Sequence, residues 1–299
     1  MGQAGGERQI VLAEVAGFCF GVQRAVEMTE AARRDRAGRV TTLGALVHNE
    51  QVIARMEAQG IGRAAALEEV RDGTVVLSAH GAAPAVRAQA KAQGLDVMDV
   101  TCPFVTKVHR MAKQLHEQGY QVVLVGDAGH TEVKGVVGLI ESLGGTVTVV
   151  ATVEAARAVS LGKKVGVVSQ TTQRPEQFAA IVAELCRRTA DVRAINTICN
   201  ATADLQAAAA RLARQVDVVI VIGGRQSANT RRLRQLCEEA GTPAYQIETA
   251  SEIVPAWLEG KERIGLTAGA STPDWILEEV ARHLNGGALP AGWRLRHPE

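Results

Sequence analysis

Short runs of aliphatic and β-branched residues alternate along the chain with longer stretches in which hydrophobic positions recur every three or four residues. The first pattern is typical of buried β-strands, and the second of amphipathic α-helices. The predicted strands are Ile10–Val15, Val75–Ser78, Val97–Val100, Gln121–Val125, Val165–Ser169, Val192–Thr197, Val218–Ile222 and Ile264–Ala268. The predicted helices are Val22–Arg34, Pro84–Gln93, Thr106–Gln118, Pro175–Arg187, Ala203–Arg214, Arg231–Ala240 and Pro273–Leu284. Alternating strands and helices predict βαβ units, parallel sheets and an α/β fold.

The alternation repeats three times, with cuts near residues 101 and 198. Each piece starts near a cysteine-bearing turn, although the pieces share no strong sequence identity, so we interpret them as a threefold pseudo-repeat of small parallel-sheet units. We predict an N-terminal strand in residues 1–15 that joins the third subdomain. The subdomains would then span residues 16–101, 102–198 and 199–284, followed by an irregular C-terminal tail at residues 285–299.

Polar residues gather just after the predicted strands. Eight strand ends lead into turns that carry Cys, His, Ser, Thr, Asn or Glu: 16–21, 79–81, 101–103, 126–132, 170–172, 198–202, 223–229 and 269–273. Ligands of α/β proteins bind beyond the carboxyl ends of the strands. Eight such turns therefore predict one polar site at which several sheets converge.

Composition and charge limit the kinds of molecule that the chain is expected to bind. The chain has 299 residues, 3% aromatic residues and a net charge of +1, which indicates neither a nucleic-acid partner nor a membrane surface. Residues 1–9 lack the pattern of a signal peptide, and the longest apolar run, Val218–Ile222, is far too short to span a membrane. We expect a soluble cytoplasmic protein with a small anionic ligand.

The five cysteines fall into two groups. Cys19, Cys102 and Cys199 occupy equivalent turns after strands, whereas Cys186 and Cys237 lie on hydrophobic helical stripes and are predicted to be packing residues. An odd number of cysteines argues against a disulfide framework. Three thiolates can hold a soft metal or a cluster, but spacing alone does not separate iron–sulfur from zinc.

Three histidines share this placement in turns. His48, His80 and His130 follow strand-like runs, whereas His109 and His116 lie seven residues apart on a helical pattern and are predicted to be surface or packing residues. The turns with Ser227 and Asn229 and with Ser271 resemble helix N-caps, where free N–H groups bind anions. The sequence contains no Walker A motif and no glycine-rich dinucleotide fingerprint, so a nucleotide is not indicated.

Taken together, these motifs resemble the 4-hydroxy-3-methylbut-2-enyl diphosphate reductases, the LytB or IspH family. The matching stretches run in order from about residue 13 to residue 282: 16–22, 48–49, 79–81, 101–103 with 106–109, 126–130, 170–172, 196–199, 227 with 229, and 269–273. Each stretch is weak by itself, but nine in the same order are specific.

The resemblance implies three α/β subdomains around a central [4Fe-4S] cluster. Cys19, Cys102 and Cys199 would hold this cluster and leave the fourth iron open to the substrate. The residues that contact the substrate diphosphate would be His48, His80, His130, Ser227, Asn229 and Ser271. Glu132 and Thr171 would lie near the hydroxymethyl end of the substrate, with His130 also in the catalytic group.

The implied reaction is a reductive dehydroxylation in the methylerythritol phosphate pathway of isoprene biosynthesis. Glu132, helped by Thr171, would supply the proton that turns the hydroxyl group into water. The products of this allylic diphosphate would be isopentenyl and dimethylallyl diphosphate. No flavin or nicotinamide fingerprint is visible, so the electrons would come from an external ferredoxin or flavodoxin.

The chain departs from the family pattern at a few positions. Ala228 stands where the family often has a second serine, Thr131 replaces a common proline, and Asp204 with Leu205 replaces a common basic–Gln pair. Two other functions therefore stay open. One is a divergent iron–sulfur or zinc paralogue, such as a zinc hydrolase or lyase, that acts on another small anion, and the other is an iron–sulfur sensor with no use for Glu132.

Overall fold

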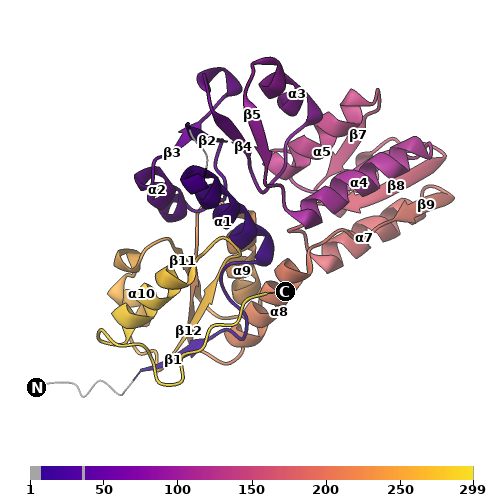
Figure 1. Cartoon of the computed structure of the whole chain (residues 1–299). Coiled ribbons are helices and arrows are strands. Elements are labelled where there is room, and N and C mark those ends of the chain that lie inside the picture. Colours follow the sequence, from indigo (N-terminus) through magenta and orange to yellow (C-terminus); the bar gives the residue numbers. More distant parts are fainter. Residues whose placement is uncertain (1–7, 36–37, 299) are drawn as a thin grey trace, which may run out of the picture. The chain divides into compact units, whose positions relative to one another are not determined.

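Three four-stranded parallel sheets form the framework of the described part of the chain, residues 8–35 and 38–298 of the computed structural model (Figure 1). Helices alternate with the strands throughout, which confirms the predicted α/β class and its three pseudo-repeated subdomains. The chain divides into two compact units. The first unit comprises 1–23, 47–55 and 200–299, and the second comprises 24–46 and 56–199.

The second unit contains two of the sheets. One has the strand order β3 (Ile61–Ala64), β2 (Val40–Leu43), β4 (Thr74–Leu77) and β5 (Asp96–Asp99). The other has the order β7 (Val147–Val150), β6 (Gln121–Val125), β8 (Lys164–Ser169) and β9 (Asp191–Ala194). The accompanying helices are α1 (Phe20–Asp35), α2 (Glu50–Ala58), η1 (Leu67–Glu69), α3 (Pro84–Ala92), α4 (Pro103–Glu117), α5 (Thr131–Ser142), α6 (Val153–Ala158) and α7 (Pro175–Cys186); α1 and α2 each begin in the first unit.

The first unit contains the third sheet, in the order β1 (Gln9–Leu12), β12 (Arg263–Ala268), β10 (Val218–Ile222) and β11 (Ala244–Ile247). Its helices are α8 (Asn200–Ala213), α9 (Ala228–Glu239), η2 (Ala250–Glu252), η3 (Pro255–Leu258) and α10 (Asp274–Leu284). The strand β1 pairs with β12 from Gln9 opposite Arg263 to Leu12 opposite Leu266.

All three sheets follow one plan. In the two sheets of the second unit, counted in chain order, the second strand lies at one edge, the first and third strands are central, and the fourth strand lies at the other edge. The third sheet has the same arrangement when β10, β11 and β12 are counted as its first three strands. In the third sheet, the N-terminal strand β1 takes the fourth place, which β5 and β9 take in the other two. Equivalent positions can therefore be compared between the three sheets by counting from the ends of equivalent strands.

Several elements were not predicted from the sequence: β2, β3, β7, β11, α2, α5 and α6. The strand predicted at Ile10–Val15 ends at Leu12, and Cys186, predicted to pack, is exposed at the end of α7. Cys237 is buried, as predicted. The subdomain boundaries drawn from the sequence stay a prediction.

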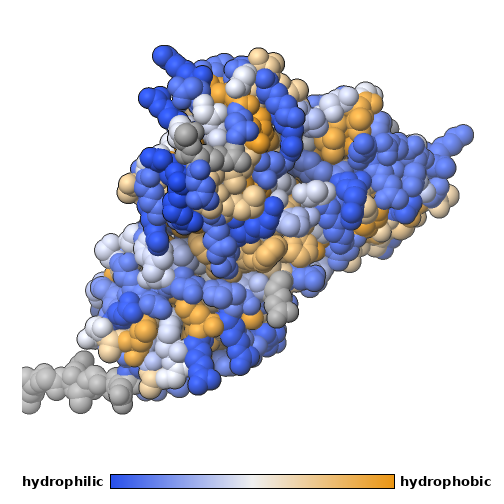
Figure 2. All heavy atoms as spheres, in the orientation of Figure 1, coloured by the Kyte–Doolittle hydropathy of each residue, from blue (hydrophilic) through white to orange (hydrophobic). Residues whose placement is uncertain are grey.

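Hydrophobic side chains fill the space between each sheet and its helices, and all five residues of β10 have no exposed surface. The face drawn in Figure 2 carries hydrophilic residues with hydrophobic patches among them. None of the helices in the described residues combines the length and the apolar composition that crossing a membrane requires.

The packing of α4 onto β8 shows how closely the layers approach. Leu115 of α4 has no exposed surface, and a Cβ added to Gly166 of β8 would lie 2.8 Å from its Cδ2. The leucine therefore occupies the space that a side chain at position 166 would need.

Leu115→Ala is expected to lower the free energy of unfolding by about 2–5 kcal/mol, because it removes buried methyl groups and leaves a cavity over Gly166. Urea unfolding followed by circular dichroism would measure the change. Leu143→Ala, at a leucine that is 40% exposed after α5, is the matched control and should change stability by less than about 0.5 kcal/mol. Equal losses in the two variants would contradict this packing.

Candidate functional site

Cys19, Cys102 and Cys199 occupy equivalent turns, each after the fourth strand of a sheet and directly before a helix. The backbone N–H of each cysteine donates to a carbonyl oxygen two residues beyond the third strand of its own sheet. The bonds run from Cys19 to Ala270 (3.1 Å), from Cys102 to Ala79 (3.0 Å) and from Cys199 to Thr171 (3.0 Å). We call these the three cysteine turns. Their equivalence, expected from the sequence, is thus reproduced in backbone hydrogen bonding.

The position before a helix favours a thiolate. The first N–H groups of a helix point towards its N-terminal end and stabilise negative charge there. Burial raises the pKa of the Cys102 thiol, whereas hydrogen bonds from the backbone N–H groups of Phe104 and Val105 lower it. The charge of Glu132 raises this pKa further, and that of Arg24 lowers it. All five cysteines are free of disulfide bonds.

The three thiols are divided between the two units, Cys19 in the first and Cys102 and Cys199 in the second. Among the described residues, no group of three or more His, Cys, Asp or Glu side chains forms a ready site for a single metal ion. Thiolates are ligands of soft metals and of iron–sulfur clusters, so each cysteine turn offers one ligand of that kind.

Glu132 and Thr171 form a buried pair in the second unit. The Thr171 backbone N–H donates to Oε1 of Glu132 and the Thr171 hydroxyl donates to Oε2, both at 2.7 Å. Glu132 lies in the first turn of α5 and is 2% exposed. Burial raises the pKa of Glu132 to about 7, although both hydrogen bonds from Thr171 lower it. The carboxyl group therefore holds an exchangeable proton near neutral pH, which suits a general acid.

His80 and His130 lie beside this pair in the second unit. Their rings meet edge to face, with centroids 5.6 Å apart. His130 caps α5, where its Nδ1 accepts the backbone N–H of Glu132 at 3.2 Å, and Nδ1 of His80 lies 3.4 Å from the Ser78 hydroxyl. The predicted turn at His130 and Glu132 is thus the start of a helix. Both imidazoles are held by neighbours, which fixes the direction in which each ring can meet a ligand.

A polar group of a different kind lies in the first unit at the start of α9. Ser227 is the N-cap, and its hydroxyl accepts the Thr230 backbone N–H at 3.2 Å. Asn229 is 4% exposed, yet neither its Oδ1 nor its Nδ2 has a hydrogen-bond partner among the described residues. A buried amide without partners costs free energy, so such a group in a folded protein is commonly kept for a ligand. The helix N-terminus beside it favours an anion.

His48 and Ser271 belong to the same unit. The Ser271 hydroxyl donates to the backbone carbonyl of His48 at 3.2 Å. A Cβ on Gly224, in the turn after β10, would lie 2.2 Å from that same carbonyl oxygen. Burial lowers the pKa of His48, and the charge of Arg231 lowers it further, whereas Glu50 raises it. The segment that begins at residue 47 therefore packs against the turns of the third sheet.

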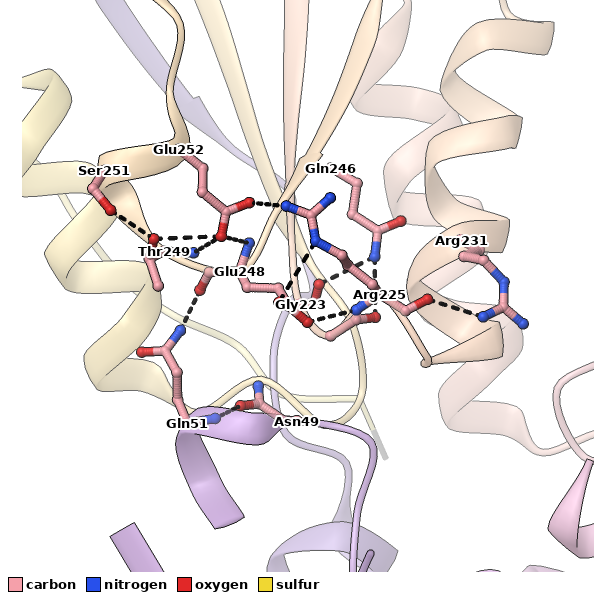
Figure 3. Close-up of polar contacts among 11 residues, drawn as sticks. Asn49, Gln51, Gly223, Arg225, Arg231, Gln246, Glu248, Thr249, Ser251 and Glu252 are labelled. Atoms are coloured by element: carbon pink, nitrogen blue, oxygen red, sulfur yellow. Dashed lines mark hydrogen bonds and ion pairs between the residues drawn. The ribbon is translucent and has the colours of Figure 1, made fainter. Parts of the chain in front are cut away.

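Figure 3 shows the polar contacts that hold these turns in place. Gln246 donates to the carbonyls of Gly223 and Gly224 at 3.1 and 3.0 Å, and the Arg225 backbone N–H donates to Glu248 at 2.7 Å. Gln51 donates from α2 to the carbonyl of Glu248 (Figure 3). This network fixes the backbone of the third sheet against the stretch that carries His48.

Counting from strand ends relates the site residues of the three subdomains. His48, His130 and Ser227 each lie five residues beyond the first strand of their sheet. His80 and Ser271 each lie three residues beyond the third strand. Equivalent backbone positions thus carry an imidazole in some subdomains and a hydroxyl in others, so one scaffold supplies different polar groups.

Sequence reasoning overlooked Arg24 near the site and assigned His109 only a surface or packing role. Arg24 donates from α1 to the carbonyl of Thr101 at 3.3 Å. The ring of His109, predicted to be a surface or packing residue, lies against Gly81 and Gly135, and its Nε2 is buried without a partner among the described residues. The only signal for Arg24 in the sequence is its position five residues after Cys19, which alone does not reveal the contact with Thr101.

Glu132→Gln is expected to change how stability depends on pH. Because burial raises the pKa of Glu132 from 4.5 to about 7, the folded protein holds a proton that the unfolded chain releases. This contribution to stability is fully present below pH 4.5 and is lost as the pH rises through 7, on the order of 3 kcal/mol in all. The variant should therefore gain stability relative to the wild type between pH 5 and pH 8.

Urea unfolding of the wild type and the variant at pH 5 and at pH 8 would measure this difference in stability. Glu141→Gln, at an exposed position of the same helix, is the control and should differ from the wild type by a constant amount. The buried-acid interpretation of Glu132 is wrong if its variant also shows a constant difference.

Known proteins resemble the chain over nearly its whole length. The family model described as LytB protein matches residues 10–285. The 4-hydroxy-3-methylbut-2-enyl diphosphate reductase of Geobacter metallireducens is 46% identical over 92% of this chain and 96% of its own length. The reductase of the same name from Aquifex aeolicus is 44% identical over 91% of this chain and 94% of its own length.

Two solved structures agree with these relatives. A structure of (E)-4-hydroxy-3-methyl-but-2-enyl diphosphate reductase is 42% identical, covers 93% of this chain and 99% of its own, and has a TM-score of 0.69. The E-1-hydroxy-2-methyl-but-2-enyl-4-diphosphate reductase of Plasmodium falciparum is 28% identical over 98% of this chain and 92% of its own, with a TM-score of 0.89. The chain is therefore a member of the LytB protein family.

Proposed function

We propose that the protein reduces (E)-4-hydroxy-3-methylbut-2-enyl diphosphate to isopentenyl and dimethylallyl diphosphate, with release of water. The reaction consumes two electrons and two protons for each hydroxyl group removed. The observation that carries the proposal is the equivalence of the three cysteine turns, in which each cysteine amide makes the same backbone hydrogen bond. The names of the relatives, at 42–47% identity, support the same substrate.

Cys19, Cys102 and Cys199 would hold one [4Fe-4S] cluster, since three thiols before three helices fit its ligand chemistry. When bound, such a cluster supplies single electrons and a Lewis-acidic iron that no protein side chain ligates. Cys186 and Cys237 take no part, because Cys186 lies exposed at the end of α7 and Cys237, on α9, is packed in the core.

The residues of the first unit suit the diphosphate. The buried amide of Asn229 offers both a donor and an acceptor without partners among the described residues, and Ser227 places it at the start of α9. Ser271 and His48 join them through the hydrogen bond from the Ser271 hydroxyl to the His48 carbonyl. Donors at a helix N-terminus bind phosphate oxygens well. Ala228 adds no hydroxyl to this group, so Ser227, Asn229, Ser271 and His48 would carry the recognition.

The residues of the second unit suit the hydroxyl end of the substrate. Burial raises the pKa of Glu132 to about 7, so a large fraction of this carboxyl group carries a proton near neutral pH, and Oε2 lies 2.7 Å from the Thr171 hydroxyl. The proton would pass from Glu132, directly or through Thr171 Oγ1, to the leaving hydroxyl and convert it into water. His80 and His130 would orient the substrate beside them. The low exposure of Glu132 keeps bulk water away from this proton.

An anaerobic assay of the iron-reconstituted protein tests the proposal. Reduced methyl viologen supplies electrons, and its oxidation should depend on the substrate and yield the two five-carbon diphosphates. Glu132→Gln should lower kcat by about 10²–10⁴-fold with unchanged iron content, the size of an effect expected for a general acid. Glu141→Gln is the control and should behave as the wild type does.

The outcomes separate the alternative functions. A fully loaded cluster without turnover would favour a divergent paralogue or a sensor, and other small diphosphates would then be screened. A colourless protein that holds zinc after oxygen-free purification would favour a zinc hydrolase or lyase. Full activity in Glu132→Gln would remove the proposed role of that carboxyl group.

Cys199→Ser is expected to lose iron and sulfide after reconstitution, because an alcohol is a poor ligand for soft iron. Cys186→Ser is the matched control and should keep the full iron content, since Cys186 is exposed at the end of α7. Iron and sulfide analysis together with the visible absorption spectrum would measure both. Equal iron content in the two variants would contradict the ligand assignment.

The electron donor and the compartment follow from the same proposal. No nicotinamide or flavin fingerprint occurs in the sequence, so an external ferredoxin or flavodoxin would deliver the electrons. The proposed substrate and products are small water-soluble diphosphates, and we expect the enzyme in the cytoplasm with them.

A further inference from the structure

Arg24 is a cationic side chain beside one of the cysteine turns. It lies on α1 in the second unit and is half-buried. Its Nη1 donates to the carbonyl oxygen of Thr101 at 3.3 Å, one residue before Cys102. Across residues 8–35 and 38–298, no carboxylate forms an ion pair with it. A guanidinium group stays protonated at every working pH, so this charge is permanent.

Arg24 and Glu132 both lie close enough to the Cys102 sulfur for a charge on either to act on it, but Glu132 is charged only when its carboxyl group is ionised. Glu132 is buried and already bonded to Thr171, and its position is explained by proton delivery. No such task accounts for Arg24, which in the described part of the chain forms one hydrogen bond, to a backbone carbonyl. Partial burial lowers the local dielectric constant, so the guanidinium acts more strongly on its neighbours than a surface charge would.

We propose that Arg24 is a positioning residue that sets the reduction potential of the cluster held by Cys19, Cys102 and Cys199. An external one-electron reductant adds one negative charge to the oxidised cluster. A fixed positive charge next to Cys102 stabilises the reduced form more than the oxidised form and therefore raises the potential. The inference rests on the proposed function, because it requires the cluster.

The side chain also has the geometry for this role. The hydrogen bond to Thr101 holds the guanidinium at the backbone that leads into Cys102. Arg34 lies on the same helix ten residues further on and is exposed. It is about 15 Å further along the helix axis, beyond the Debye length of about 10 Å at 0.1 M salt. Arg24 thus provides a positive charge near Cys102, and Arg34 provides a distant one on the same helix for comparison.

The test is a potentiometric titration of the reconstituted protein with dithionite and mediators, followed by the electron paramagnetic resonance signal of the reduced cluster. Arg24→Gln keeps an N–H donor for the Thr101 carbonyl but removes the charge. This variant should shift the reduction equilibrium about tenfold towards the oxidised form. For a one-electron couple, that shift corresponds to a reduction potential about 59 mV lower. Arg24→Lys keeps the charge and should retain most of the wild-type potential. Arg34→Gln should leave the potential unchanged.

The inference is overturned if Arg24→Gln has the wild-type potential, or if Arg24→Lys shifts it as much as Arg24→Gln does. The second result would assign the effect to geometry and not to charge. If Arg24→Gln does not load its cluster, Arg24→Met serves as the neutral variant, and its reduction potential is expected to be lower by the same amount. A wild-type protein without any cluster would overturn the proposed function as well. A loaded and active wild type with an unaffected neutral variant would overturn the inference alone.

Discussion

The hydrogen bond from each cysteine amide to a carbonyl beyond the third strand of its sheet is the constraint on which the site depends. It ties the end of the fourth strand to the end of the third strand, and the helix that follows starts from that point. Because the bond involves only backbone atoms, it does not itself occupy the cysteine sulfur. The same tie in the Cys199 turn involves the carbonyl of Thr171, whose N–H and hydroxyl bind Glu132. One residue thereby links a cysteine turn to the buried acid.

The two units carry polar groups of different kinds, and each kind has its own free-energy cost. In the first unit, Asn229 is buried with its amide unsatisfied by the described residues. In the second, Glu132 is buried deeply enough to raise its pKa to about 7. Both features lower the stability of the folded protein. Such residues are expected at positions that are kept for binding or catalysis and not for stability. The all-apolar strand β10 and the leucine packed over Gly166 offset such costs elsewhere.

Much of the fold could be predicted because hydrophobic periodicity reports burial directly. The central strands β6 and β10 are nearly continuous apolar runs and were predicted, whereas the central strand β2 (Val40–Leu43), which contains two threonines, was not. Edge strands were missed where their sequences lack that signal, as in Ile61–Ala64, which contains Gly62 and Arg63. The start of α5 was interpreted as a turn because histidine is an uncommon cap, and its capping contact to Glu132 depends on the tautomer of one ring.

Site residues were predictable where motif and strand end coincide, as for the three cysteines. What the sequence could not provide was contact between distant positions. The packing of the His48 carbonyl against Gly224 joins residues that lie more than 170 positions apart, and the bond from Arg24 to Thr101 spans 77 positions. Neither has a local signature. The exposure of Cys186 likewise depends on where α7 ends, which periodicity does not fix.

The place of β1 in the third sheet has a consequence for the order in which the protein can be made. This strand leaves the ribosome long before its partner β12, which lies about 250 positions later. At typical rates of synthesis, the wait lasts roughly 10–50 s. Sheets confined to 40–99 and 121–194 can form during that time, whereas the third cannot. The Cys19 turn, which hydrogen-bonds to Ala270, is therefore the last of the three cysteine turns to form in the nascent chain.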